Sequence, residues 1–144
     1  MIPLLDVNVL VALAWPNHVH HRLARTWFEA QHAAGWATCP VTETGFVRIS
    51  SNPRVVDEAR TPKEAVLLLQ RMLQIPGHRF WTDDVSVAQL SSEFARVHGY
   101  RQVMDAHLLA LARRNDGRLA AFDRRITDLL ARDADRDRYV LILE

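Results

Sequence analysis

Apolar residues recur at helical spacing in several segments of the chain, and short apolar runs stand between those segments. The first run, at 2–5, has the composition of a buried strand. The segment after it keeps apolar residues three and four positions apart, which predicts a helix over 7–14 that stops before Pro16. Asp6 stands between the two and is expected to cap the turn from strand to helix.

The rest of the chain repeats this alternation of short apolar runs and amphipathic segments. Helices are expected over 20–35, from a cap at Thr42 to Asn52, from a cap at Thr61 to Gln74, from a cap at Asp83 or Asp84 to Gly99, over 102–115, and around 124–131. Further strands are expected at 36–39, 78–81, 118–122 and 139–143.

Strands that alternate with helices in this way predict the α/β fold class. The expected architecture is three-layered, with a central, mainly parallel sheet of about five strands between helices. A length of 144 residues fits one domain, so we expect residues 1–144 to form a single domain. A hydrophobic content of 49% with 24% charged residues is ordinary for a folded globular protein.

The basic residues are almost all arginine, although the formal net charge is only +1. Lys63 is the only lysine among 18 basic residues. This bias has two explanations, a GC-rich coding sequence and the binding of phosphate groups, which suits the planar guanidinium. The near-neutral balance argues against a passive polycationic binder, so bound nucleic acid would need local arginines and a cation.

Cys39 is the only cysteine, which excludes an intrachain disulfide and is typical of a reducing compartment such as the cytoplasm. Its apolar neighbours favour a small buried residue over a reactive thiol. The N-terminus lacks the positive region of a signal peptide, and no run approaches the ~18 apolar residues of a membrane span. We therefore expect no membrane association.

Four acidic residues fall where predicted strands end or helices begin. Asp6 and Asp123 follow strands, while Glu43 and Asp105 lie near the starts of helices. Ligands of parallel sheets bind beyond the carboxyl ends of the strands, so the four carboxylates are expected to converge on one rim. Oxygen ligands of this kind suit Mg²⁺ or Mn²⁺ better than zinc.

A carboxylate-bound divalent cation beside a phosphodiester activates water and neutralises developing charge, so phosphodiester hydrolysis is the leading reaction class. Each acid also has a plainer explanation. An aspartate after a strand often only caps the next helix, and Asp123 can be paired by Arg124 or Arg125.

Five ordered segments then carry a resemblance. LLDVNVLVALAWPNHVHH, GWATCPVTETGFVRISSNPR, FWTDDVS, GYRQVMDAHLLALA and RLAAFDRRI resemble the PIN-domain ribonucleases of the VapC toxin type, and in particular a mycobacterial-type branch. The resemblance implies a three-layer PIN fold and a homodimer. It also implies Mg²⁺- or Mn²⁺-dependent endonucleolytic cleavage of RNA, and inhibition by a cognate VapB-type antitoxin.

The resemblance assigns the catalytic and metal-binding quartet to Asp6, Glu43, Asp105 and Asp123. It implies that Asp123 acts through water or a second ion. Asn8 matches a polar residue that orients a carboxylate or a metal-bound water, and Thr42 precedes the glutamate as in the family. Met104 and Ala121 depart from the family, which commonly has hydroxyl residues there; each removes a group that could bond a carboxylate, water or phosphate.

Other polar residues are open to functional and structural interpretations. Phosphate or antitoxin binding is possible for Arg48, Arg54, Arg101, Arg124 and Arg125, with Arg124 the leading candidate and an intramolecular ion pair its alternative. For His18, His20 and His21, capping and packing are favoured over a metal site. For Asp83 and Asp84, helix capping is favoured over an extension of the acidic cluster. His107 is expected to face the core or a neighbouring helix rather than the site. The tryptophans are expected in the core or a dimer interface.

The sequence favours a toxin-type endoribonuclease and leaves two alternatives open. One is a PIN nuclease that processes housekeeping RNA, which an adjacent antitoxin gene would argue against. The other is a PIN binding module with weakened catalysis, which only Met104 and Ala121 support.

Overall fold

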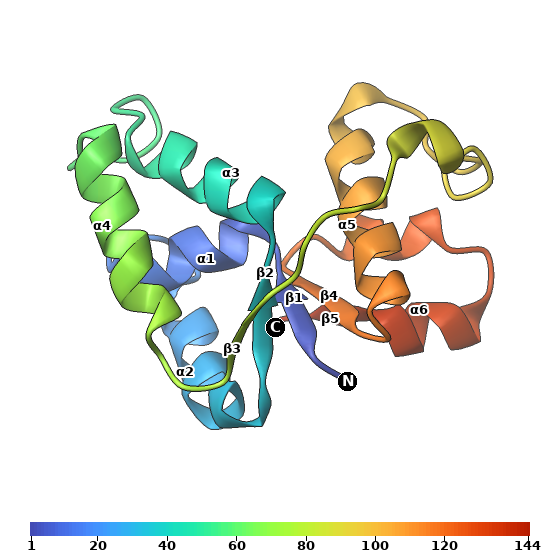
Figure 1. Ribbon diagram of the computed structural model, residues 1–144, viewed down its shortest axis with the longest axis horizontal. Coiled ribbons are helices and arrows are strands. Elements are labelled where there is room, and N and C mark those ends of the chain that lie inside the picture. The colour runs from blue at the N-terminus through green and yellow to red at the C-terminus, as the bar shows by residue number, and fades with distance from the viewer.

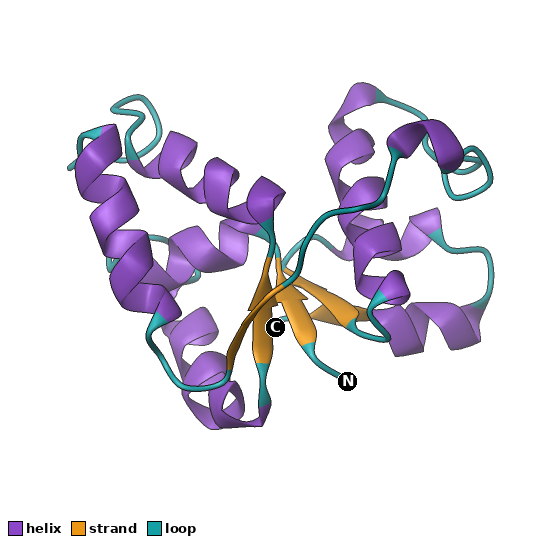
Figure 2. Cartoon of the chain, viewed as in Figure 1, coloured by secondary structure: helices purple, strands orange, loops and turns teal.

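The computed structural model describes all residues, 1–144, and is built on a single five-stranded sheet in the order β3-β2-β1-β4-β5 (Figures 1 and 2). Every neighbouring pair is parallel. The strands are β1 (Pro3–Leu5), β2 (Trp36–Thr38), β3 (His78–Phe80), β4 (Arg118–Ala121) and β5 (Val140–Ile142). This confirms the predicted α/β class with a central parallel sheet.

Helices cover the sheet on both faces and complete three layers (Figure 1). One side carries α1 (Val7–Ala14), α2 (His21–Gln31), α3 (Pro40–Ser50) and α4 (Pro62–Leu73); the other carries α5 (Val103–Arg114) and α6 (Asp133–Tyr139). Each side has its own apolar core. Trp36 and Phe46 are fully buried on the α1–α4 side, and Leu4 and Leu108 on the α5 side.

The expected helix starts are confirmed where the capping chemistry is strong. Asp6 caps α1 and accepts a hydrogen bond from the Val7 backbone N–H at 2.8 Å. Thr61 caps α4, and its reciprocal bonds with Glu64 satisfy two backbone donors that the helix leaves free. At α3 the prediction was wrong, because the helix begins at Pro40 with Cys39 as its cap, so Thr42 lies inside the first turn.

The predicted helix up to Gly99 is also wrong. Residues 82–99 contain only the short 3₁₀ turn Val87–Gln89 and a series of separate turns. Leu90 is buried, and Phe94 packs against the core on the α5 side, so the apolar spacing is used without a continuous helix.

Two smaller differences concern the C-terminal part. The helix expected around 124–131 is a 3₁₀ helix, η4 (Arg124–Leu129), and α6 was not among the predicted elements.

None of the helices has both the length and the apolar character needed to cross a membrane.

Candidate active site

All four candidate acids lie at the edge of the sheet where the strands end, and the charges of three of them, Asp6, Asp105 and Asp123, act on one another there. Asp6 follows β1, Asp123 follows β4, and Asp105 lies in the first turn of α5. Asp6 is buried, at 8% exposure, and Asp105 is half-buried. Because β1 and β4 are adjacent and parallel, their carboxyl ends place these acids side by side.

These carboxylates repel one another in a poorly solvated place. Burial raises the pKa of Asp6 to about 6, against the Val7 hydrogen bond that lowers it, and the charge of Asp123 adds to the rise. Burial raises the pKa of Asp105 to about 7, with further contributions from the charges of Asp6 and Asp123. A bound cation would relieve this repulsion.

Asp123 is held by Arg125. Its carboxylate caps η4 by accepting from the Arg125 backbone N–H at 2.9 Å, and the Arg125 guanidinium donates to both oxygens at 3.1 and 3.0 Å. These bonds hold the pKa of Asp123 below its usual value. Asp123 is therefore the one acid of the three that already has a cationic partner.

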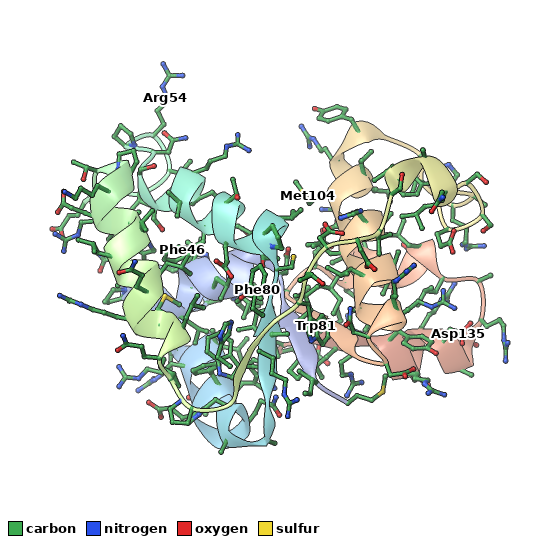
Figure 3. All side chains as sticks on the ribbon, viewed as in Figure 1. Phe46, Arg54, Phe80, Trp81, Met104 and Asp135 are labelled. Atoms are coloured by element: carbon green, nitrogen blue, oxygen red, sulfur yellow. The ribbon has the colours of Figure 1, made fainter.

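Arg124, the leading arginine candidate, pairs instead with the carboxylate of Glu144 near the C-terminus. Capping geometry could have identified Arg125, because a capping aspartate bonds the backbone N–H two residues further on and brings that side chain near. A second candidate, Arg54, projects from the loop after α3, on the far side of that helix from α5 (Figure 3).

Glu43 lies in the first turn of α3, and its hydrogen-bond partner is Thr38 rather than a residue of the aspartate group. Its carboxylate accepts a hydrogen bond from the Thr38 hydroxyl at 2.8 Å. Thr38 shares a face of β2 with Trp36, whose side chain belongs to the core on the α1–α4 side. Asp105 belongs to α5 on the opposite side, so Glu43 would have to rotate to join it.

No group of three or more His, Cys, Asp or Glu side chains is close enough together to hold a metal ion as the side chains stand. The donors nevertheless fit a hard divalent cation, because all are carboxylate oxygens. Burial raises the pKa values of both Asp6 and Asp105, and a bound cation would stabilise their ionised forms. Asp6, Asp105 and Asp123 are the residues that would hold it.

The expected supporting residues have other contacts. Thr42 is buried, and its hydroxyl accepts from the Cys39 backbone N–H at 3.0 Å, which fixes the start of α3. Asn8 is exposed and lines a cavity of about 780 Å³ beside α4, with no hydrogen bond to the acids. Met104 is 48% exposed on the side of α5 turned toward α3 (Figure 3), and Ala121 is fully buried.

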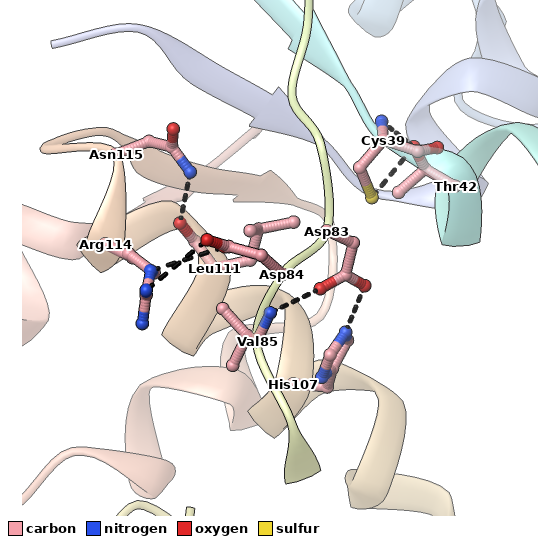
Figure 4. A network of polar contacts seen from close by, with 9 residues as sticks. All are labelled: Cys39, Thr42, Asp83, Asp84, Val85, His107, Leu111, Arg114 and Asn115. Carbon is pink, nitrogen blue, oxygen red and sulfur yellow. Dashed lines mark hydrogen bonds and ion pairs between the residues drawn. The ribbon is translucent and has the colours of Figure 1, made fainter. Parts of the chain in front are cut away.

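A buried pair fastens the segment after β3 to α5 (Figure 4). Asp83 lies 2.5 Å from His107 Nε2, both side chains being 11% exposed, and Asp83 also accepts from the Val85 backbone N–H. Asp84 adds an ion pair with Arg114 at 3.3 Å. His107 is buried, as the packing interpretation expected, but it contacts this non-helical segment rather than a neighbouring helix. The helix that Asp83 or Asp84 was expected to cap does not form.

The histidine cluster is also used for packing and hydrogen bonding. His20 stacks on Phe122 with ring centroids 4.4 Å apart, and the His21 ring nitrogen Nδ1 lies 2.7 Å from the Ala12 carbonyl oxygen. His18 accepts from the His20 backbone N–H at 3.0 Å. These contacts join the start of α2 to α1 and to the residue before Asp123.

Comparison with known proteins agrees with this architecture. Residues 4–130 match the PIN domain family. The chain is 49% identical to Ribonuclease VapC39 of Mycobacterium tuberculosis over 129 residues, covering 89% of this chain and 93% of that protein. It is 52% identical over 120 residues to Ribonuclease VapC38 of the same organism, covering 83% and 84%.

A further relative, Ribonuclease VapC44, is 43% identical over 127 residues, covering 88% of this chain and 89% of the relative. The chain therefore belongs to the PIN-domain family, and within it to the mycobacterial-type VapC group. The family expected from the sequence motifs is confirmed.

Proposed function

We propose that this protein is a VapC-type endoribonuclease that hydrolyses RNA phosphodiester bonds with Mg²⁺ or Mn²⁺. The observation that carries the proposal is the placement of Asp6, Asp105 and Asp123 at the carboxyl ends of the adjacent strands β1 and β4 and the start of α5, with Asp105 and Asp123 lining one cavity. The names of the VapC relatives support ribonuclease activity. Glu43 is proposed as the fourth acid, recruited from its bond with Thr38.

The residues of the chain would divide the work. Asp6 is fixed by its own helix cap, so it would provide a rigid ligand, and Asp105 a partly solvated one. The cation, when bound, would supply an activated water and neutralise charge on the phosphate. Arg125 is 84% exposed beside Asp123 and would bind a neighbouring phosphate. Attack by water needs no ribose 2′-hydroxyl.

The proposed partners follow from the family. We propose that a cognate VapB-type antitoxin inhibits the enzyme, that the enzyme forms a homodimer, and that it acts in the cytoplasm as a toxin. Co-expression with the protein encoded by an adjacent upstream gene should restore growth if that protein is the antitoxin. The absence of such a gene would favour the alternative role in housekeeping RNA processing.

The direct test is RNA cleavage by the purified wild type in Mg²⁺, compared with Asp6→Asn. We expect the variant to lose cleavage and growth inhibition while keeping its fold, because asparagine still caps α1 but binds a cation poorly. Asp128→Asn is the matched control, since Asp128 is exposed and its side chain has no ion pair. Full activity in Asp6→Asn would contradict the proposal and favour a metal-free binding module.

A further inference from the structure

An exposed aromatic side chain stands beside the candidate active site. Tyr100 begins the 3₁₀ turn η3 (Tyr100–Gln102), which leads directly into α5 and Asp105. The residue is 80% exposed. An aromatic ring in such a position offers a flat apolar surface together with a polar hydroxyl.

The neighbouring Arg101 provides a cation at the same place. Its guanidinium carbon lies 5.7 Å from the Tyr100 ring centroid, and its Nε donates to the Tyr100 hydroxyl at 3.3 Å. No carboxylate forms an ion pair with Arg101, whereas Arg124 and Arg125 are both paired. Arg101 therefore keeps its charge available for an anionic ligand.

Arg101 shares a cavity with two of the candidate metal ligands. The cavity has a volume of about 260 Å³, and its lining includes Arg101, Asp105, Asp123 and Arg125. A phosphodiester that reaches the two aspartates thus lies beside both arginines. The adjoining nucleotide of the same strand would stand next to Tyr100.

The apolar surface continues along α5. Val103 and Met104 are 41% and 48% exposed, and they follow Tyr100 at the three- and four-residue spacing that places side chains on one face. An unpaired base presents a π-face that stacks on such a surface, whereas the bases of a duplex are already stacked and paired. The unpaired cation of Arg101 favours a nucleic acid over an apolar protein partner.

We propose that Tyr100 and Arg101 form a nucleotide-binding platform, in which the ring stacks on an unpaired RNA base and the guanidinium binds an adjoining phosphate. The platform holds the nucleotide that adjoins the phosphate beside Asp105 and Asp123. This inference rests on the proposed ribonuclease function and adds to it two residues that bind the substrate outside the metal site.

The test measures binding without cleavage, by the fluorescence anisotropy of a labelled short single-stranded RNA and of its duplex, in EDTA at low salt. Tyr100→Ala should weaken single-strand binding about tenfold and leave duplex binding unchanged, whereas Tyr100→Phe should bind as the wild type does. Arg101→Ala should weaken binding and reduce the slope of log affinity against log salt by about 0.7.

Arg138→Ala is the matched control, and it should change neither value. Arg138 also lies over a neighbouring tyrosine ring, 5.2 Å from the centroid of Tyr139, and has no ion pair, but it lies on α6. The control therefore removes a similar positive charge outside the cavity that contains Asp105.

Three results would overturn the platform: unchanged single-strand affinity in Tyr100→Ala, an equal loss for single strand and duplex, or a loss in Tyr100→Phe as large as in Tyr100→Ala. The first of these results, if Tyr100→Ala also self-associates more weakly in sedimentation, would assign the surface to a second copy of the chain. A wild type that binds through Tyr100 without cleaving RNA contradicts only the ribonuclease proposal.

Discussion

The starts of α3 and α5 each bring one acid to the same edge of the sheet, yet they hold it differently. Glu43 at α3 is bonded by Thr38, which in turn contacts His78 Nε2 at 2.7 Å. Asp105 at α5 has no hydrogen bond from the protein and is opposed by the charges of Asp6 and Asp123. The protein satisfies one acid with its own hydroxyl and leaves the other without a hydrogen-bond donor, and we propose that a cation takes that place.

The largest effect should come from Asp105→Asn compared with Glu43→Gln. We expect each to reduce Mg²⁺-dependent RNA cleavage by about a hundredfold or more, because each removes a proposed charged ligand. Only Asp105→Asn should also stabilise the metal-free protein at pH 8, by about 1 to 2 kcal/mol, since it removes a repelled, half-buried charge whose partial solvation reduces the effect.

Urea denaturation in EDTA measures this stability difference. Two results would contradict the difference between the two helix starts. One is that Glu43→Gln stabilises the protein as much as Asp105→Asn does, and the other is that Asp105→Asn destabilises it.

The next largest effect is a pH dependence of the free energy of unfolding that comes from Asp6 and Asp105. In the folded protein the pKa values are about 6 for Asp6 and about 7 for Asp105, above the ordinary 3.8, so between these limits the folded state binds more protons than the unfolded state. Stability of the metal-free protein should therefore fall as pH rises from 4 to 7.

We expect this contribution to be on the order of 3 kcal/mol after allowance for the partial exposure of Asp105. The measurement is the difference in unfolding free energy between the wild type and Asp6→Asn/Asp105→Asn across that range, with Asp128→Asn as control. A difference that stays constant with pH would show that these carboxylates are not held protonated by the fold.

A smaller effect should separate the two adjacent arginines. Arg125→Ala removes the bonds that hold Asp123, so we expect Mn²⁺ affinity to rise about threefold at pH 8 as Asp123 becomes available to the ion. Arg124→Ala should leave the affinity unchanged, because Arg124 pairs with Glu144. Isothermal titration distinguishes the two, and equal changes would mean that Asp123 is not a ligand.

The smallest effect is expected from Thr38→Val, which frees Glu43 without changing the size of the side chain. Mn²⁺ affinity should rise about twofold, while loss of the hydroxyl bonds lowers stability by about 1 kcal/mol. Thr42→Val is the control, since Thr42 is equally buried but bonds only to Cys39. Weaker metal binding in Thr38→Val would mean instead that Thr38 orients Glu43 for the ion.

The sequence predicted the alternation of strands and helices because local signals agreed with tertiary packing. Asp6 after an apolar run and Thr61 before a proline each mark a helix start in the sequence, and both cap helices in the structure. The prediction of a helix before Gly99 was wrong, because the apolar residues of this segment reach the core from separate turns rather than from one helix face. The direction of the Glu43 side chain could not be predicted either. Its hydrogen bond to Thr38 depends on which face of β2 carries Thr38, and the sequence does not give that.

The most direct test of the central claim, that Asp6, Asp105 and Asp123 form one divalent cation site, is calorimetric titration of the protein with Mn²⁺ at pH 8. We expect binding by the wild type and by Asp128→Asn, and an affinity at least about tenfold lower in Asp6→Asn. No heat from the wild type at millimolar metal, or equal binding by Asp6→Asn, would contradict it.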